Sequence, residues 1–141
     1  LPDSFIAGLR QAVEQENPNA MVLGEVWEDG SNKIAYGVRR KHLLGGHLDG
    51  LMNYPVRTAA RDYLLGGDAA AFRSALEVLR EHYPPFAFHN AMNFLGTHDT
   101  PRILTVLGLG TAEAAEAADT LLTPAQKEQA LKRLLSRSLS C

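Results

Sequence analysis

The strongest constraint on this chain is the spacing of three short apolar segments, which lie between stretches of helical periodicity. The segments cover residues 20–26, 48–53 and 91–95. Each has the length of a buried strand and is too short for a helix. The intervals between them are too long for tight hairpins, so we expect parallel strands joined by right-handed helical crossovers. The alternation predicts an α/β fold.

Helical patterns account for most of the remaining chain. A helix is predicted from Asp3 or Ser4 to about residue 16, a second from Pro55 to Gly66, and a third from Asp68 to Tyr83. Thr123–Gln126 reads Thr-Pro-Ala-Gln, a capping box with proline at the first helical position, and predicts a C-terminal helix. Residues 28–47 contain several glycines and predict irregular structure with at most a short helix.

Polar and aromatic side chains follow each predicted strand. They are Glu25 and Trp27 after the first strand, Asn53 and Tyr54 after the second, and His98 and Asp99 after the third. In parallel α/β sheets and barrels, ligands bind at the carboxyl ends of the strands. Two carboxylates, an imidazole and an aromatic face are the groups from which a sugar-cleaving site is built.

Each of these residues also has a simpler interpretation. Glu25 taken alone is more readily a solvated or ion-paired residue at a strand end, and Asp99 taken alone is a turn cap. His98 can be a loop histidine, and Trp27 can be a core residue as readily as a platform for a sugar ring. The individual residues therefore do not decide the function.

Three segments together resemble signature regions of the α-amylase family of retaining glycoside hydrolases. They are Gly24–Trp27, Leu48–Pro55 and Phe94–Arg102, and they occur in the order found in the family. The middle segment is similar to the neopullulanase, cyclomaltodextrinase and maltogenic amylase branch. The resemblance runs from residue 1 to about residue 107. It implies a partial (β/α)8 TIM barrel, roughly its C-terminal half, with strands five to seven and without the last strand.

The resemblance also implies roles for the residues at the strand ends. Glu25 corresponds to the family's proton donor, and Asp99 to the carboxylate that stabilises the transition state. His98 corresponds to a histidine that binds sugar hydroxyls. Trp27 is expected to stack on a sugar ring, and Asn53 and Tyr54 are expected to line an acceptor subsite.

One catalytic group of the family is missing from these residues. The nucleophilic aspartate belongs to a motif of the form G-x-R-x-D, which does not occur in this chain. The resemblance places that aspartate a few residues upstream of Leu1. The chain has 141 residues and begins with leucine, whereas a complete barrel needs roughly 250. We therefore expect residues 1–141 to be a fragment of a single catalytic barrel domain.

Composition excludes several other classes of protein. The net charge of −2 disfavours a nucleic-acid partner, and no apolar run has the length of a membrane span. The single cysteine, Cys141, excludes an intrachain disulfide. His42, His47 and Asp49 are poor candidates for a metal site, because Gly45 and Gly46 intervene and the strand register after Leu48 is unsuitable. No cofactor is therefore expected, although calcium in a longer parent protein stays open.

The leading hypothesis is part of a hydrolase of α-1,4-linked glucans, with starch, maltodextrin, pullulan or cyclodextrin as substrate. A transglycosylase or isomerase of the same family is equally compatible, because water and sugar acceptors share one covalent intermediate. A non-catalytic barrel that binds carbohydrate or another partner is the alternative from a different class. Open strand edges also predict self-association of the isolated chain.

Overall fold

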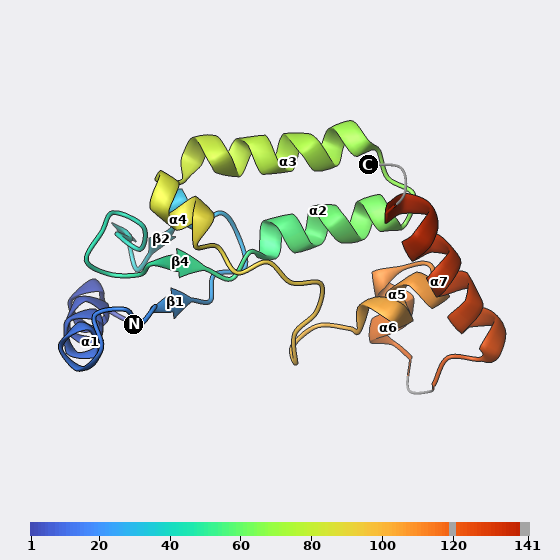
Figure 1. Ribbon diagram of the computed structural model, residues 1–141, viewed down its shortest axis with the longest axis horizontal. Coiled ribbons are helices and arrows are strands. Elements are labelled where there is room, and N and C mark those ends of the chain that lie inside the picture. The colour runs from blue at the N-terminus through green and yellow to red at the C-terminus, as the bar shows by residue number, and fades with distance from the viewer. Residues whose placement is uncertain (119–120, 139–141) are drawn as a thin grey trace. The chain divides into compact units, whose positions relative to one another are not determined.

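The structure is a computed structural model that describes residues 1–118 and 121–138 (Figure 1). The chain divides into two compact units. The first contains Leu1–Pro55 and Ala75–Asn93, and the second contains Val56–Ser74 and the segment from Phe94 onward. The predictions that concern Cys141, and in part the missing last strand, lie outside the described residues.

A short parallel ladder forms the centre of the first unit. Strand β1 (Leu23–Gly24) pairs in parallel with β4 (Gly50–Leu51), with Leu23 opposite Gly50. Met52 then forms a parallel bridge with Met92. The three predicted strand segments therefore lie side by side in chain order and run parallel, as the sequence predicts (Figure 1).

The strands are shorter than the apolar runs that predicted them. Only residues 23–24 of the first run are in a strand, and only Met92 of the third run is paired. Side chains take over the hydrogen bonds next to the ladder. The carboxylate of Asp49 accepts a hydrogen bond from the backbone amide of Val22 at 2.7 Å. The side-chain nitrogen of Asn53, Nδ2, donates a hydrogen bond to Asn93 Oδ1 at 2.9 Å.

Close backbone approach holds the third segment against β4. A Cβ atom on Gly50 would lie 2.4 Å from the carbonyl oxygen of Asn90, so only glycine fits there without movement. Helix α4 (Pro85–His89), which the sequence did not predict, delivers Asn90 to this position. Helix α1 (Asp3–Glu16), which the sequence did predict, is tied to the ladder by an ion pair of 3.3 Å between Arg10 and Asp49.

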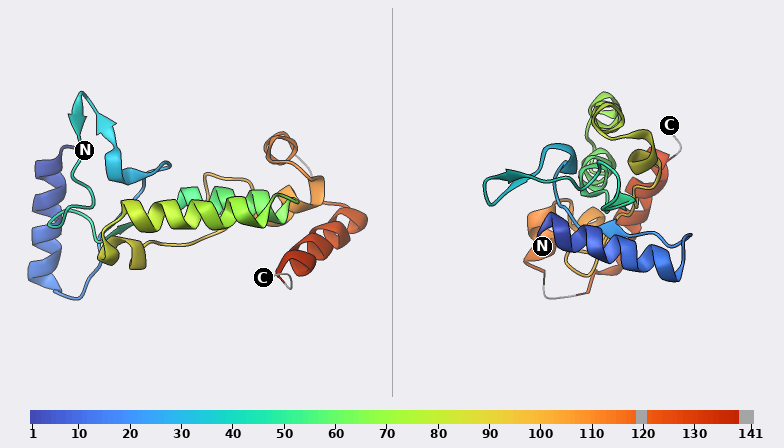
Figure 2. Two further views of the ribbon diagram at one scale, coloured as in Figure 1. Left: turned by 90° about the horizontal axis from the view of Figure 1, so that it is seen from above. Right: turned by 90° about the vertical axis from the view of Figure 1, so that its left-hand side faces the viewer.

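A hairpin lies in the region for which the sequence predicted only irregular structure. The 3-10 helix η1 (Gly30–Asn32) precedes strands β2 (Ile34–Ala35) and β3 (Val38–Arg39), which pair antiparallel. The two-residue turn between the strands has φ angles of 54° at Tyr36 and 73° at Gly37. The short η1 agrees with the prediction, whereas the absence of regular structure from the rest of this region was wrong (Figure 2).

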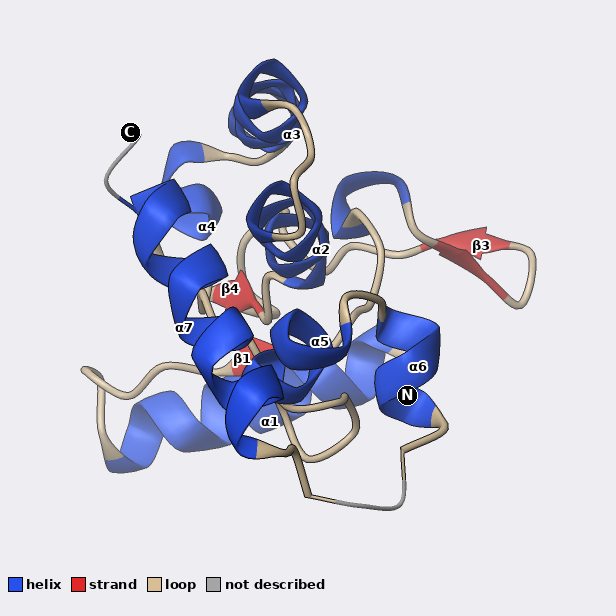
Figure 3. Cartoon of the chain, turned by 90° about the vertical axis from the view of Figure 1, so that its right-hand side faces the viewer, coloured by secondary structure: helices blue, strands red, loops and turns tan. Residues whose placement is uncertain are grey.

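The second unit is helical. It contains most of α2 (Tyr54–Leu64), the first turns of α3 (Ala69–His82), and the helices α5 (Ile103–Leu109), α6 (Ala112–Glu116) and α7 (Pro124–Ser138). Leu64, Leu107 and Ala130 form its buried core, and α5 packs on α7 (Figure 3). The predicted capping box is present, because the amide of Thr123 donates to Gln126 Oε1 at 2.8 Å and the amide of Gln126 donates to Thr123 Oγ1 at 3.3 Å.

Candidate active site

The ladder of the first unit places Glu25 beside Tyr54. Glu25 directly follows β1, and Tyr54 follows β4 after two residues, Met52 and Asn53. The amide of Met52 donates to the carbonyl of Gly24 at 2.9 Å, which fixes the two strand ends in register. Tyr54 Oη then donates to Glu25 Oε1 at 2.6 Å. The strand therefore delivers this carboxylate to its carboxyl end, as the sequence predicts.

Trp27 completes a small cluster around the same carboxylate oxygen. Its Nε1 donates to Glu25 Oε1 at 3.1 Å. Its ring stacks on that of Tyr54, with centroids 4.6 Å apart and planes 13° from parallel. Tyr54 is 3% exposed, whereas Trp27 is 54% exposed. Trp27 is therefore not a core residue, and it presents aromatic surface to solvent beside Glu25.

Asn53 joins two of the strand segments. The side chain is buried, and its hydrogen bond to Asn93 connects the end of β4 to the residue that follows Met92. This contact stabilises the local backbone in which Tyr54 is set. The predicted contribution of Asn53 and Tyr54 to an acceptor subsite stays a prediction.

His98 and Asp99 lie in the second unit, within a tight turn. His98 Nε2 is 3.2 Å from the Asp99 carboxylate, and the imidazole is 84% exposed. Hydroxyl groups close the turn, since the amide of Thr97 donates to Thr100 Oγ1 at 2.9 Å and the amide of Asp99 donates to Thr97 Oγ1 at 3.3 Å. The structure thus groups Glu25 with Trp27 and Tyr54 in one unit, and His98 with Asp99 in the other.

A cleft of about 560 Å³ in the first unit contains Glu25 and Trp27 on its wall. Apolar side chains such as Val22 and Leu48 form part of its lining, as does Tyr36 from the hairpin turn. Sequence reasoning did not select Tyr36. The available signal was the pair Tyr36-Gly37, which lies between the apolar residues Ile34 and Val38. A pair that contains glycine between two apolar stretches is typical of a hairpin with a two-residue turn.

The segment after Trp27 is attached to the end of α3. The amide of Gly30 donates to Tyr83 Oη at 3.2 Å, and His82 Nδ1 donates to the carboxylate of Asp29. Partial burial opposes ionisation of Asp29, but the hydrogen bonds from His82 and Ser31 outweigh it and hold the pKa of the Asp29 carboxyl below its usual value. Burial raises the pKa of the Tyr83 phenol, which stays neutral.

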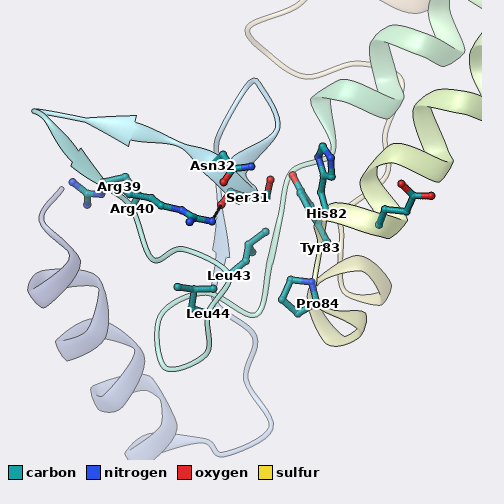
Figure 4. Close-up of a pocket in the computed structure, with 10 residues that line it drawn as sticks. Ser31, Asn32, Arg39, Arg40, Leu43, Leu44, His82, Tyr83 and Pro84 are labelled. Carbon is teal, nitrogen blue, oxygen red and sulfur yellow. Dashed lines mark hydrogen bonds between the residues drawn. The ribbon is translucent and has the colours of Figure 1, made fainter.

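These contacts border a second cavity of about 300 Å³. Some of its lining residues follow Glu25 and Trp27 closely in the sequence, but neither of those two side chains is part of the lining. Figure 4 shows His82 and Tyr83 next to the segment of Ser31 and Asn32, with Leu43 between the loop and α3. The attachment gives the backbone that follows Glu25 and Trp27 a fixed course. It is a positioning feature that sequence reasoning did not detect.

One residue of the metal site considered above, Asp49, has other interaction partners. Asp49 accepts from the amide of Val22 and pairs with Arg10, so its carboxylate is used within the fold. Across residues 1–118 and 121–138, no three His, Cys, Asp or Glu side chains are grouped as metal ligands. In the same part of the chain, no helix is long and apolar enough to cross a membrane.

A parallel ladder that carries a carboxylate and aromatic rings at its carboxyl end defines an α/β protein with a candidate hydrolytic site. Residues 2–129 match the family described as "Alpha amylase, catalytic domain". The chain therefore belongs to the α-amylase family, and its fold is part of an α/β barrel.

Relatives of known name support this assignment. An amylopullulanase of Thermoanaerobacter thermohydrosulfuricus is 34% identical over 142 residues, which cover 92% of this chain and 9% of the relative. A cyclomaltodextrinase of Geobacillus thermopakistaniensis is 38% identical over 106 residues, which cover 74% of this chain and 16% of the relative. A solved structure of a cyclomaltodextrinase matches with a TM-score of 0.59 and 28% identity, over 75% of this chain and 19% of the other. The chain thus spans a small part of the length of these relatives.

Proposed function

We propose that this chain carries the acid/base half of the active site of an α-amylase-type glycoside hydrolase. Glu25 is the proton donor, and Asp99 is the carboxylate that stabilises positive charge in the transition state. The observation that carries this proposal is the hydrogen bonding of Glu25 Oε1 to both Tyr54 and Trp27 at the end of β1. Two donors on one oxygen restrict the rotation of the carboxyl group, which is a requirement of directed proton transfer.

The proton held by the Glu25 carboxyl group is the one that the reaction transfers. In the first step this proton goes to the glycosidic oxygen as the bond to the anomeric carbon breaks and a nucleophilic carboxylate bonds to that carbon. In the second step Glu25 removes a proton from water, which attacks the same carbon and releases the nucleophile.

The nucleophile is proposed to lie outside this chain, because no G-x-R-x-D motif occurs in its sequence. On this proposal the three parallel segments are strands five, six and seven of the barrel, and the two compact units are parts of a single catalytic domain. The proposed role of Asp99, with His98 beside it, is to stabilise positive charge in the transition state. A retaining mechanism is part of this proposal, and the resemblance of the motifs around Glu25 and Asp99 to those of the family supports it.

The proposed substrates are α-1,4-linked glucans, which include maltooligosaccharides, starch and cyclodextrins. The names of the relatives, amylopullulanase and cyclomaltodextrinase, support this class. The exposed ring of Trp27 beside Glu25 supports it as well, because an aromatic surface can cover the apolar face of a pyranose. Analysis of the reaction products distinguishes water from a sugar as the preferred acceptor, since both attack the same covalent intermediate.

The test is the substitution Glu25→Gln in the full-length protein that contains this chain. Glutamine keeps the size of the side chain but cannot deliver a proton, so we expect turnover of maltoheptaose and soluble starch to fall by a factor of about 10² or more. Glu14→Gln is the matched control, because Glu14 is an exposed residue of helix α1 and is not part of the lining of the cleft that contains Glu25. Activity within a factor of ten of wild type in Glu25→Gln would remove Glu25 from the acid/base role.

A further inference from the structure

Tyr36 has a backbone conformation that its residue type does not favour. Its φ of 54° lies in the left-handed region, where a Cβ atom approaches the following carbonyl oxygen. Glycine, asparagine and aspartate are the usual residues at such a position in a two-residue hairpin turn. The Tyr36 ring is 95% exposed, so burial within the described structure does not compensate for the strain. A strained residue with a fully presented aromatic ring is a candidate for direct binding.

The hairpin that carries Tyr36 is held at its base. The amide of Arg40 donates to the carbonyl of Lys33 at 2.7 Å, and Arg39 Nη2 donates to the carbonyl of Ser31 at 3.4 Å. Both contacts connect the end of β3 to the segment before β2. In Figures 2 and 3 the hairpin extends away from α1 and α4 of the same unit. Tyr36 therefore lies in the turn of a short hairpin whose base is fixed by hydrogen bonds.

Tyr36 shares a cleft with residues of the candidate active site. Tyr36 lines the same cleft as Glu25 and Trp27. The ion pair of Lys33 and Glu28 also lines this cleft, and it offers a hydrogen-bond donor and an acceptor within the same cleft. An aromatic face with polar groups at its edge is the chemistry that binds a pyranose, whose ring has apolar faces and an equatorial belt of hydroxyl groups.

We propose that Tyr36 is a sugar-binding residue that holds a glucose unit of an α-glucan beyond the one cleaved, so that the hairpin selects for longer chains. This inference rests on the proposed function, because it takes Glu25 as the point of cleavage. The strained φ is maintained because the ring must leave the turn toward the cleft. Tyr36 therefore contributes to binding of long substrates and contributes little to the chemistry at the scissile bond.

The experiment compares maltoheptaose with maltotriose as substrates of the full-length protein. Tyr36→Asn removes the ring and keeps a residue that tolerates positive φ, so the hairpin is preserved. We expect the ratio of kcat/KM for maltoheptaose to that for maltotriose to fall roughly tenfold, which corresponds to about 1.4 kcal/mol. Tyr36→Trp, which keeps an aromatic face, should retain most of the wild-type ratio. Ile34→Thr is the control on the same hairpin and should leave the ratio unchanged.

The possible outcomes separate this inference from the proposed function. If the wild-type protein cleaves both substrates and Tyr36→Asn leaves the ratio unchanged, Tyr36 does not bind substrate and only this inference fails. If Tyr36→Asn lowers turnover of both substrates equally, Tyr36 has a structural role, and the inference again fails. If the wild-type protein cleaves neither substrate, the proposed function fails, and the inference fails with it.

Discussion

The close approach at Gly50 allows the effect of one added methyl group on the ladder to be worked out. In Gly50→Ala the new Cβ atom would lie 2.4 Å from the carbonyl oxygen of Asn90 and 2.8 Å from its carbonyl carbon. Carbon and oxygen atoms in contact are about 3.3–3.6 Å apart. The segment that leads to Met92 must therefore retreat from β4 by about 1 Å.

That retreat removes two hydrogen bonds of the ladder. The amide of Asn53 donates to the carbonyl of Met92, and the amide of Met92 donates to the carbonyl of Leu51, each at 2.9 Å. A further 1 Å places both beyond hydrogen-bonding distance. Because each bond contributes about 0.5–1.5 kcal/mol, we expect this part of the ladder to lose about 1–3 kcal/mol. A loss of that size speeds amide exchange by roughly 5-fold to 150-fold, since 1.4 kcal/mol is a factor of ten.

Hydrogen exchange followed by mass spectrometry measures this in the full-length protein, with peptides that cover residues 50–53 and 90–93. Gly8→Ala is the matched control, because apart from its chain neighbours and the nearby backbone of its own helix, no described atom lies within 4 Å of the Cβ that it would add. It replaces glycine inside helix α1, so we expect slower exchange in α1 and no change in the ladder. Unchanged exchange at Asn53 and Met92 in Gly50→Ala would refute the argument from close approach.

Three further predictions follow from the structure. Asp99→Asn in the full-length protein should raise the activation free energy of the reaction by about 3 kcal/mol, and so lower kcat, with little change in the melting temperature. A large drop in melting temperature with activity per folded molecule intact would instead give Asp99 a structural role in its turn. Because the pKa of Asp29 is held low in the folded state, its ionisation stabilises the fold above the ordinary aspartate pKa of about 3.9, and this contribution is lost as the pH falls through the lower folded value. Denaturant unfolding against pH should therefore show a decline at acid pH that is smaller in Asp29→Asn; an identical decline in both proteins would contradict the role of Asp29. The 141-residue chain expressed alone should have no glycosidase activity and should self-associate, because it lacks the nucleophile motif and exposes strand edges; a monodisperse monomer in size-exclusion chromatography would argue against the second point.

Periodicity and terminal signals predicted the long helices well. Helices α1, α2, α3 and α7 have apolar stripes, and Asp68 and Thr123 mark the starts of α3 and α7 as expected, with Asp68 Oδ1 accepting from the amide of Ala70 at 3.1 Å. Parallel order was also predictable, because helices separate the apolar segments. The extent of the strands was not predictable, since it depends on which backbone groups bond to side chains, as the amide of Val22 does to the carboxylate of Asp49.

The sequence predicted that some candidate residues lie near one another, but it did not predict the atoms through which they are in contact. The strand ends predicted that Glu25 and Tyr54 share one edge, and the structure places them in hydrogen-bonding contact. The stacking of Trp27 on Tyr54 depends on side-chain rotamers, about which the sequence is silent. The hairpin at Tyr36 was missed, because tyrosine is not a residue that signals positive φ and the strands on either side have only two residues each.

The pairing order of the ladder has a consequence for the synthesis of the chain. Each segment pairs with the one made before it, since contacts join residues 27 positions apart at Val22 and Asp49, and 40 positions apart at Asn53 and Asn93. Closing loops of these two lengths differs in entropic cost by only a few tenths of a kcal/mol, because the cost rises with the logarithm of length. Chain order therefore favours one order of pairing, because the residues of the first pairing are synthesised before those around Met92, and the third segment is made after both strands of its acceptor edge.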